Sequence, residues 1–124
     1  MQTEKTMIRD EQTENFEYCK HIAEELRACH EGCGANEDGE PADLWDYFAD
    51  ALDIEYVITS GLEYSGVKAY VTLGGPTCWI DTDRGAVCLT WGGKSAECYL
   101  SSALVEAIDD IFAEYYAAAL DARR

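Results

Sequence analysis

Short apolar runs between residues 54 and 100 constrain the fold more than any other feature of the sequence. The runs are IEYVITS, VKAYVTL, TCWIDT, AVCLTW and SAECYL. Their two-residue alternation and their content of β-branched and aromatic residues are typical of strands. Glycine-containing segments separate them: Ser60-Gly61 with Ser65-Gly66, Gly74-Gly75-Pro76, Asp83-Arg84-Gly85 and Gly92-Gly93. Strands that follow one another through short turns predict an antiparallel meander of about five strands over residues 54–100.

Helical periodicity lies on both sides of this region. Apolar residues from Phe16 to Cys29 recur at helical spacing and predict a helix over about 14–31, ended by the Gly32 to Gly39 stretch. Pro41 suits the first turn of a second helix, whose apolar face would contain Leu44, Phe48, Ala51 and Leu52. A third helix is predicted after the Ser101-Ser102 cap, with the apolar stripe Leu104, Ile108, Ile111, Phe112, Tyr115 and Ala119.

These elements predict an α+β fold, in which the meander packs with an N-terminal helix pair and a C-terminal helix. The sheet face expected to be covered by helices contains Ile54, Tyr56, Ile58, Ala69, Val71, Cys78, Ile80 and Cys88. Residues 1–12 lack apolar periodicity and are expected to form a flexible leader. No linker divides residues 13–124, so they are expected to form one domain.

Acidic residues are concentrated in the N-terminal part of the chain. The sequence has 25 Asp and Glu against nine Lys and Arg, a net charge of −16. Ten of these acids, and neither Lys nor Arg, fall between Arg27 and Lys68. At about 100° per residue, a continuous second helix would place Asp43, Asp46, Asp50 and Asp53 within an arc of about 80°. The candidate partner-binding residues are this Asp row together with Glu37, Asp38 and Glu40.

A negative field of this kind predicts the type of partner. It repels phosphates and anionic lipids, which argues against direct binding to nucleic acid or membrane and favours a basic protein. Helix neighbours lie about 5–6 Å apart, close to the spacing of successive phosphates, so the row could imitate a nucleic-acid backbone. The alternative is that the charge serves solubility alone.

Catalytic and metal-binding patterns are weak. The two histidines, His21 and His30, fit no known catalytic spacing, so no catalytic residue is assigned and no enzymatic activity is expected. Cys29 and Cys33 are four residues apart, but zinc needs four ligands, so neither a metal site nor a cofactor is expected. The Asp81 to Gly85 segment resembles the start of a calcium loop but lacks the downstream Glu, which favours a hairpin turn.

The polar N-terminus and the absence of a long apolar stretch predict a cytoplasmic protein. In that reducing compartment the six cysteines are expected to be free thiols.

The segment GGPTCWIDTDRGAVCLTWGG, followed by a Ser-capped helix with EAIDDIF, resembles small acidic proteins carried by phages and conjugative elements of gut bacteria. The resemblance covers about residues 53–116. Some of those proteins accompany anti-CRISPR or anti-restriction genes, so the resemblance implies a place in that gene neighbourhood. Together with the acidic row, it leads us to expect an inhibitor that mimics DNA and blocks a bacterial defence nuclease, with a Cas effector of the Cas9 type preferred over a restriction enzyme. Two alternatives remain. One is an adaptor or homodimer that assembles through Tyr70, Trp79 and Trp91, and the other is a metal-dependent enzyme or redox protein that uses the cysteines.

Overall fold

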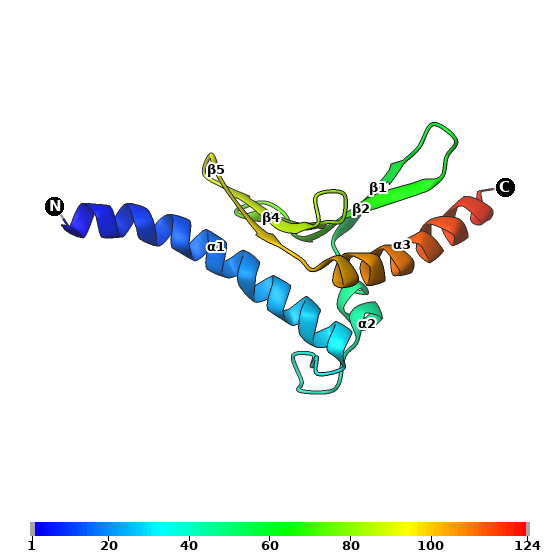
Figure 1. Ribbon diagram of the computed structural model, residues 1–124, viewed down its shortest axis with the longest axis horizontal. Coiled ribbons are helices and arrows are strands. Elements are labelled where there is room, and N and C mark those ends of the chain that lie inside the picture. Colours follow the sequence, from blue (N-terminus) through cyan, green and yellow to red (C-terminus); the bar gives the residue numbers. More distant parts are fainter. Residues whose placement is uncertain (1, 124) are drawn as a thin grey trace.

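The computed structural model describes residues 2–123, and it describes the side chains of residues 14–123. The elements are α1 (Gln2–Glu31), α2 (Leu44–Phe48), β1 (Asp53–Ile58), β2 (Tyr64–Thr72), β3 (Thr77–Asp81), β4 (Ala86–Trp91), β5 (Lys94–Tyr99) and α3 (Ser102–Ala122) (Figure 1). All neighbouring strands pair antiparallel, in the order β1-β2-β3-β4-β5. The predicted α+β fold with a five-stranded meander is confirmed.

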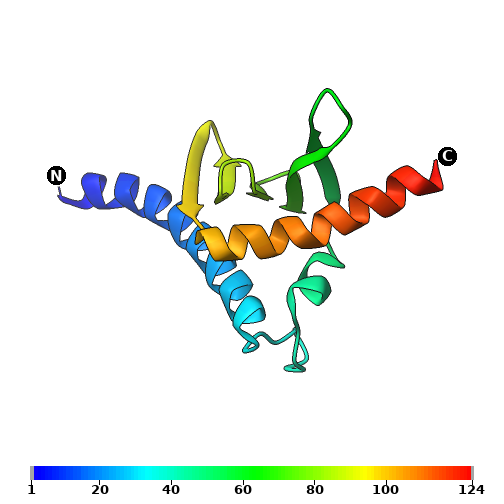
Figure 2. The ribbon, with the colours of Figure 1, turned by 45° about the vertical axis from the view of Figure 1, so that its right-hand side comes forward.

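Both long helices cover the same face of the sheet. α1 packs against β4 and β5, and α3 packs against β2. Figure 2 shows the strands on one side of the two long helices. It shows α2, and the loop that precedes α2, on the other side. One apolar core fills the space between sheet and helices, and its fully buried side chains include Leu26, Val67, Ile80, Leu89, Ile108 and Phe112.

Strand register decides which side chains face this core. Ile80 pairs with Ala69 on one side and with Val87 on the other, so these three share the covered face. Cys88 pairs with Trp79 and therefore points to the opposite face, which corrects the expectation that it lies under the helices. A bulge between Val57 and Ile58 breaks the alternation, and Ile58 is 42% exposed rather than covered. Core residues that sequence reasoning missed are Val67, Val87 and Leu89.

The end of α1 lies where the sequence predicts it. Gly32 follows the helix with φ of +83°, and the N–H of Cys33 donates to the carbonyl of Ala28 (2.8 Å). This left-handed glycine closes the helix because it reaches that conformation without a Cβ clash. The helix begins at Gln2 rather than at about residue 14. Nothing in the described part of the chain tests the flexible leader predicted for residues 1–12, and it stays a prediction.

The second helix is shorter than predicted. A capping box holds its start, because Asp43 Oδ1 accepts from the Asp46 N–H (2.9 Å) and Asp46 Oδ2 accepts from the Asp43 N–H (3.0 Å). After Phe48 the chain turns towards the sheet, where the Leu52 N–H donates to the Tyr70 carbonyl (2.8 Å). Pairing with β2 thus replaces the last helical turns, and Leu52 is exposed instead of sharing the buried face.

The third helix agrees with its sequence signals. Ser101 Oγ accepts from the N–H of Leu104 (3.2 Å), which satisfies one of the free donors at the start of α3. The predicted stripe is buried as far as Phe112, and its last members, Tyr115 and Ala119, are exposed. Among the described helices, none combines the length and apolar composition that a membrane span requires.

Thiol reactivity tests this packing. The six cysteines are free, and Cys33 is the one that is exposed. Burial raises the pKa of Cys29, and it raises the pKa of Cys88 to about 12. A thiol with a raised pKa stays protonated at about pH 8, and the protonated form is unreactive. A disulfide reagent at this pH is therefore expected to modify Cys33 fast and to modify the buried thiols only after unfolding. Mass spectrometry of timed samples measures this, and fast modification of Cys88 in the folded protein would contradict the packing.

The same shift has a consequence for stability. The folded-state pKa of Cys88 lies above its unfolded value of about 8.5. The contribution of the Cys88 thiol to the free energy of unfolding is therefore complete below about pH 8.5, and it is lost as the pH rises towards 12.

Candidate protein-binding surface

The loop between α1 and α2, residues 32–43, is ordered by its own hydrogen bonds. Asn36 Oδ1 accepts from the backbone N–H groups of Asp38 and Glu40, both at 2.9 Å. The Ala42 N–H donates to the Gly34 carbonyl (2.9 Å), which closes the base of the loop. The loop therefore presents Glu37 and Asp38 in a defined position rather than on a free chain.

Gly34 fixes this loop against the end of α1. A Cβ atom at this position would lie 2.5 Å from the Ala42 carbonyl oxygen and 2.6 Å from Cys29 Sγ. No other residue fits without displacement of the backbone. The loop and the helix end therefore form one packed unit.

A groove of about 630 Å³ lies between α1, this loop and the segment around α2. Its apolar wall includes Tyr18, Ile22, Tyr47 and Val71, and its carboxylates are Glu25, Glu37, Asp38, Asp46 and Asp50. No Lys, Arg or His is among the described residues that line it. We call it the acidic groove.

The seven predicted partner-binding residues are all exposed, but the structure brings only some of them together. Glu37, Asp38, Asp46 and Asp50 line the acidic groove. Asp43 caps α2 and lines a second groove, and neither groove includes Glu40 or Asp53. Because α2 ends at Phe48 and Asp53 begins β1, the four Asp do not form a row on one helix, and the predicted helical spacing of charges is wrong.

Glu25 is the groove carboxylate that sequence reasoning missed. It follows Ile22 by three residues and precedes Cys29 by four, so it lies beside the buried face of α1. This position in the sequence could have identified Glu25, because an acid at the border of the apolar stripe of a helix lies close to the segment that packs on that stripe. His21 Nε2 lies 2.6 Å from Glu25 Oε1, with both side chains substantially exposed, so this pair contributes little to stability.

The pKa values of Tyr47 and Cys29 are raised first by burial and then by the nearby carboxylates. Burial raises the pKa of Tyr47, and Glu25 raises it further. The pKa of the Cys29 thiol is raised by burial and then by Glu25, Asp43 and Asp46. Both shifts disfavour additional negative charge at this end of the molecule. A cation placed there would be favoured by the same field.

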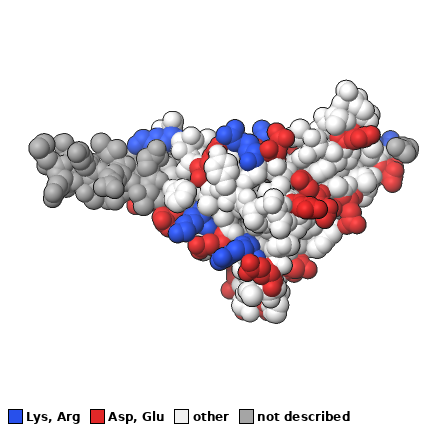
Figure 3. Space-filling model, in the orientation of Figure 1, with Lys and Arg blue, Asp and Glu red and all other residues white. Residues whose placement is uncertain are grey.

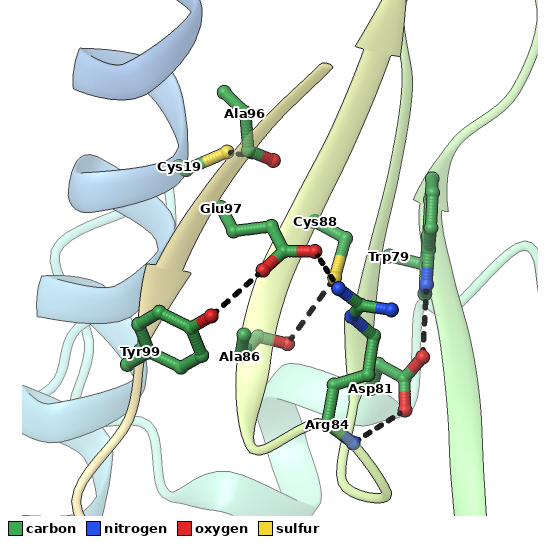
Figure 4. A network of polar contacts seen from close by, with 9 residues as sticks. All are labelled: Cys19, Trp79, Asp81, Arg84, Ala86, Cys88, Ala96, Glu97 and Tyr99. Carbon is green, nitrogen blue, oxygen red and sulfur yellow. Dashed lines mark hydrogen bonds and ion pairs between the residues drawn. The ribbon is translucent and has the colours of Figure 1, made fainter.

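The structure separates the two thiols of the Cys29 and Cys33 pattern. α1 ends between Cys29 and Cys33, which leaves one thiol buried and the other exposed. Among the described side chains, no group of three or more Cys, His, Asp or Glu could hold a metal ion. Asp81 instead organises a hairpin turn, since its carboxylate accepts from the Arg84 N–H (3.0 Å) and the Trp79 indole (3.4 Å) (Figure 4).

The sheet face opposite the helices carries mixed charge. An ion pair between Arg84 and Glu97 lies close to the buried Cys88 (Figure 4).

Tyr70 and Trp79 pack together on the sheet face opposite the helices, with ring centroids 5.9 Å apart. Trp91 follows Leu89 by two residues and so belongs to the helix-covered side, at the exposed end of β4. The three aromatics of the homodimer alternative therefore do not form one surface.

Comparison with known proteins found no match to the chain among family models, curated proteins or solved structures. The resemblance to mobile-element proteins stays a prediction from the sequence.

Proposed function

We propose that this chain is a non-catalytic inhibitor that occupies the basic nucleic-acid site of a bacterial defence nuclease. The supporting observation is the acidic groove, in which five carboxylates from three neighbouring segments meet and no described lining residue is basic. On the face drawn in Figure 3, Lys and Arg lie along α1 and over the sheet, while acidic side chains dominate over α3. Acidic side chains lie beside these bases along α1, so the two signs are mixed there, and negative charge dominates over α3.

The acidic groove suits the long side chains of Lys and Arg better than the predicted row of Asp residues on one helix would. Lys and Arg carry apolar stems below their charged ends, and the wall with Ile22, Tyr47 and Val71 offers apolar surface to those stems. The carboxylates then meet the charged ends. A nuclease channel that holds DNA through such side chains would lose access to the DNA phosphates when this surface occupies it.

The class of target comes from the resemblance to mobile-element proteins. A phage or conjugative element gains from blocking an enzyme that cuts incoming DNA. Cas9-type nucleases read a short DNA motif through arginines and hold the guide–target duplex in a positively charged channel, so they present the complementary surface. Restriction enzymes present basic DNA clefts of the same general character.

Salt dependence of binding tests this proposal. The purified protein is immobilised, and a panel of Cas9-type nucleases and restriction enzymes is passed over it at salt from about 0.05 to about 0.5 M. We expect at least one nuclease to be retained at low salt and released as salt rises, because screening weakens exposed charge pairs. A basic protein that does not bind nucleic acid serves as control. Retention of no nuclease, or retention that salt does not affect, would contradict the proposal.

A further inference from the structure

A second groove, of about 550 Å³, lies on the other side of α2 between the end of α1 and α3. Its apolar lining includes Leu44, Trp45, Ala107 and Ile111. Three carboxylates, Asp43, Asp110 and Glu114, lie around these residues, with Cys29 and His30 completing the lining. We call it the aromatic groove.

Trp45 is held in place before any partner arrives. Its ring packs edge-to-face with Tyr115 at a centroid distance of 5.2 Å, and Tyr115 in turn contacts Phe112 at 5.7 Å. Phe112 packs on Phe48 at 5.0 Å inside the core. This chain of rings connects the indole to the rigid interior, yet 41% of Trp45 remains exposed. A fixed, exposed indole in an apolar depression is typical of residues that dominate the energy of an interface.

The charges of the aromatic groove select the occupant. No Lys or Arg lines it in the described part of the chain, and its three carboxylates are exposed. A cation is therefore favoured, and an indole binds cations through its ring face. Arginine satisfies both features at once, because its planar guanidinium stacks on an aromatic ring while its N–H groups donate to a carboxylate. A lysine ammonium lacks the planar surface and the forked donors.

We propose that the aromatic groove binds an arginine side chain presented by the polypeptide of a protein partner, with Trp45 as the stacking surface and Glu114 as the main acceptor. The inference rests on the proposed function for its basic partner. It adds the type of residue recognised and a second point of contact, separated from the acidic groove by α2.

A peptide assay tests the groove without any nuclease. The probes are hexa-arginine, hexa-lysine and hexa-citrulline peptides, and the readout is the NMR signal of the Trp45 indole N–H, assigned with Trp45→Phe. We expect saturable shifts with hexa-arginine, binding weaker by about fivefold or more with hexa-lysine, and no shift with neutral hexa-citrulline.

Matched variants separate local recognition from the overall field. Glu114→Gln is expected to weaken hexa-arginine binding about tenfold. Glu106→Gln removes the same charge from an exposed residue of α3 outside the groove, and it should change the affinity by less than about twofold. Trp45→Phe keeps an aromatic ring and should bind hexa-arginine better than Trp45→Ala. Both variants lack the indole signal, so titration calorimetry measures their affinities, and circular dichroism checks that each variant is folded.

The inference is overturned if arginine and lysine peptides bind equally and neither Trp45→Ala nor Glu114→Gln changes their affinity. It is also overturned if hexa-arginine shifts only residues of the acidic groove, or if the uncharged peptide binds as well. Peptide binding that persists while every nuclease fails to bind would contradict the proposed function alone. Nuclease binding without peptide selectivity would contradict this inference alone.

Discussion

Replacing Phe112 with alanine is expected to lower the free energy of unfolding by about 3–5 kcal/mol. The ring is fully buried and packs against Phe48 at a centroid distance of 5.0 Å, so it connects α3 to α2 within the core. Its loss removes apolar contacts and leaves a cavity that the sheet and the helices can fill only in part. Domains are typically stable by about 5–15 kcal/mol, so the change removes a large share of the total. Urea unfolding measures it as a lower midpoint.

An exposed apolar side chain provides the control. Leu52 is 60% exposed, and Leu52→Ala should change the free energy of unfolding by less than about 0.5 kcal/mol. A loss below about 1 kcal/mol for Phe112→Ala would show that α3 is not packed on the core as described.

Charge reversal in the acidic groove is expected to have the largest effect on function. The triple variant Glu37→Lys, Asp38→Lys and Asp50→Lys should weaken binding to the target nuclease by about 100-fold or more, because repulsion replaces attraction at the centre of the contact. These three side chains line the groove. Asp46 is left unchanged, since its carboxylate belongs to the capping box of α2. Titration calorimetry at moderate salt measures the affinity.

A second triple variant carries the same change in net charge elsewhere. Glu17, Glu63 and Glu106 are exposed and lie outside both grooves, so reversing them to lysine should weaken binding by less than about fivefold. Equal losses in the two triple variants would mean that total charge, and not the groove, determines binding. Circular dichroism should show unchanged secondary structure in both.

The sheet could be predicted because its signals are local. Two-residue alternation between glycine turns identifies each strand, and short turns leave little choice but a meander. The register is not local. The sequence predicts Cys88 on the covered face, yet its pairing with Trp79 and Glu97 places it on the other one. A shift of one residue exchanges the faces of a strand, and only pairing with its neighbours fixes that choice.

The candidate surface could be predicted in composition but not in shape. The base-free sequence between Arg27 and Lys68 contains four of the five groove acids, but it also contains Asp53, Glu55 and Glu63, which lie in the β1–β2 hairpin. The predicted row of Asp residues on one helix is wrong, because the hydrogen bond between Leu52 and Tyr70 brings the chain into the sheet soon after Phe48. Long-range packing of the loop on α1 then brings Glu25 beside Asp46 and Asp50 in one groove. Sequence spacing carries no information about that approach.

Competition with DNA tests the central claim most directly. A fluorescent target duplex is titrated with a retained nuclease, carrying its guide RNA where the enzyme uses one, at several fixed concentrations of this protein, and fluorescence anisotropy reports the fraction of duplex bound. The account predicts that the apparent dissociation constant of the duplex rises in proportion to the concentration of the protein, and that the groove triple variant does not produce this rise. A ternary complex, in which the nuclease holds both the duplex and this protein with unchanged affinity for the duplex, would contradict it.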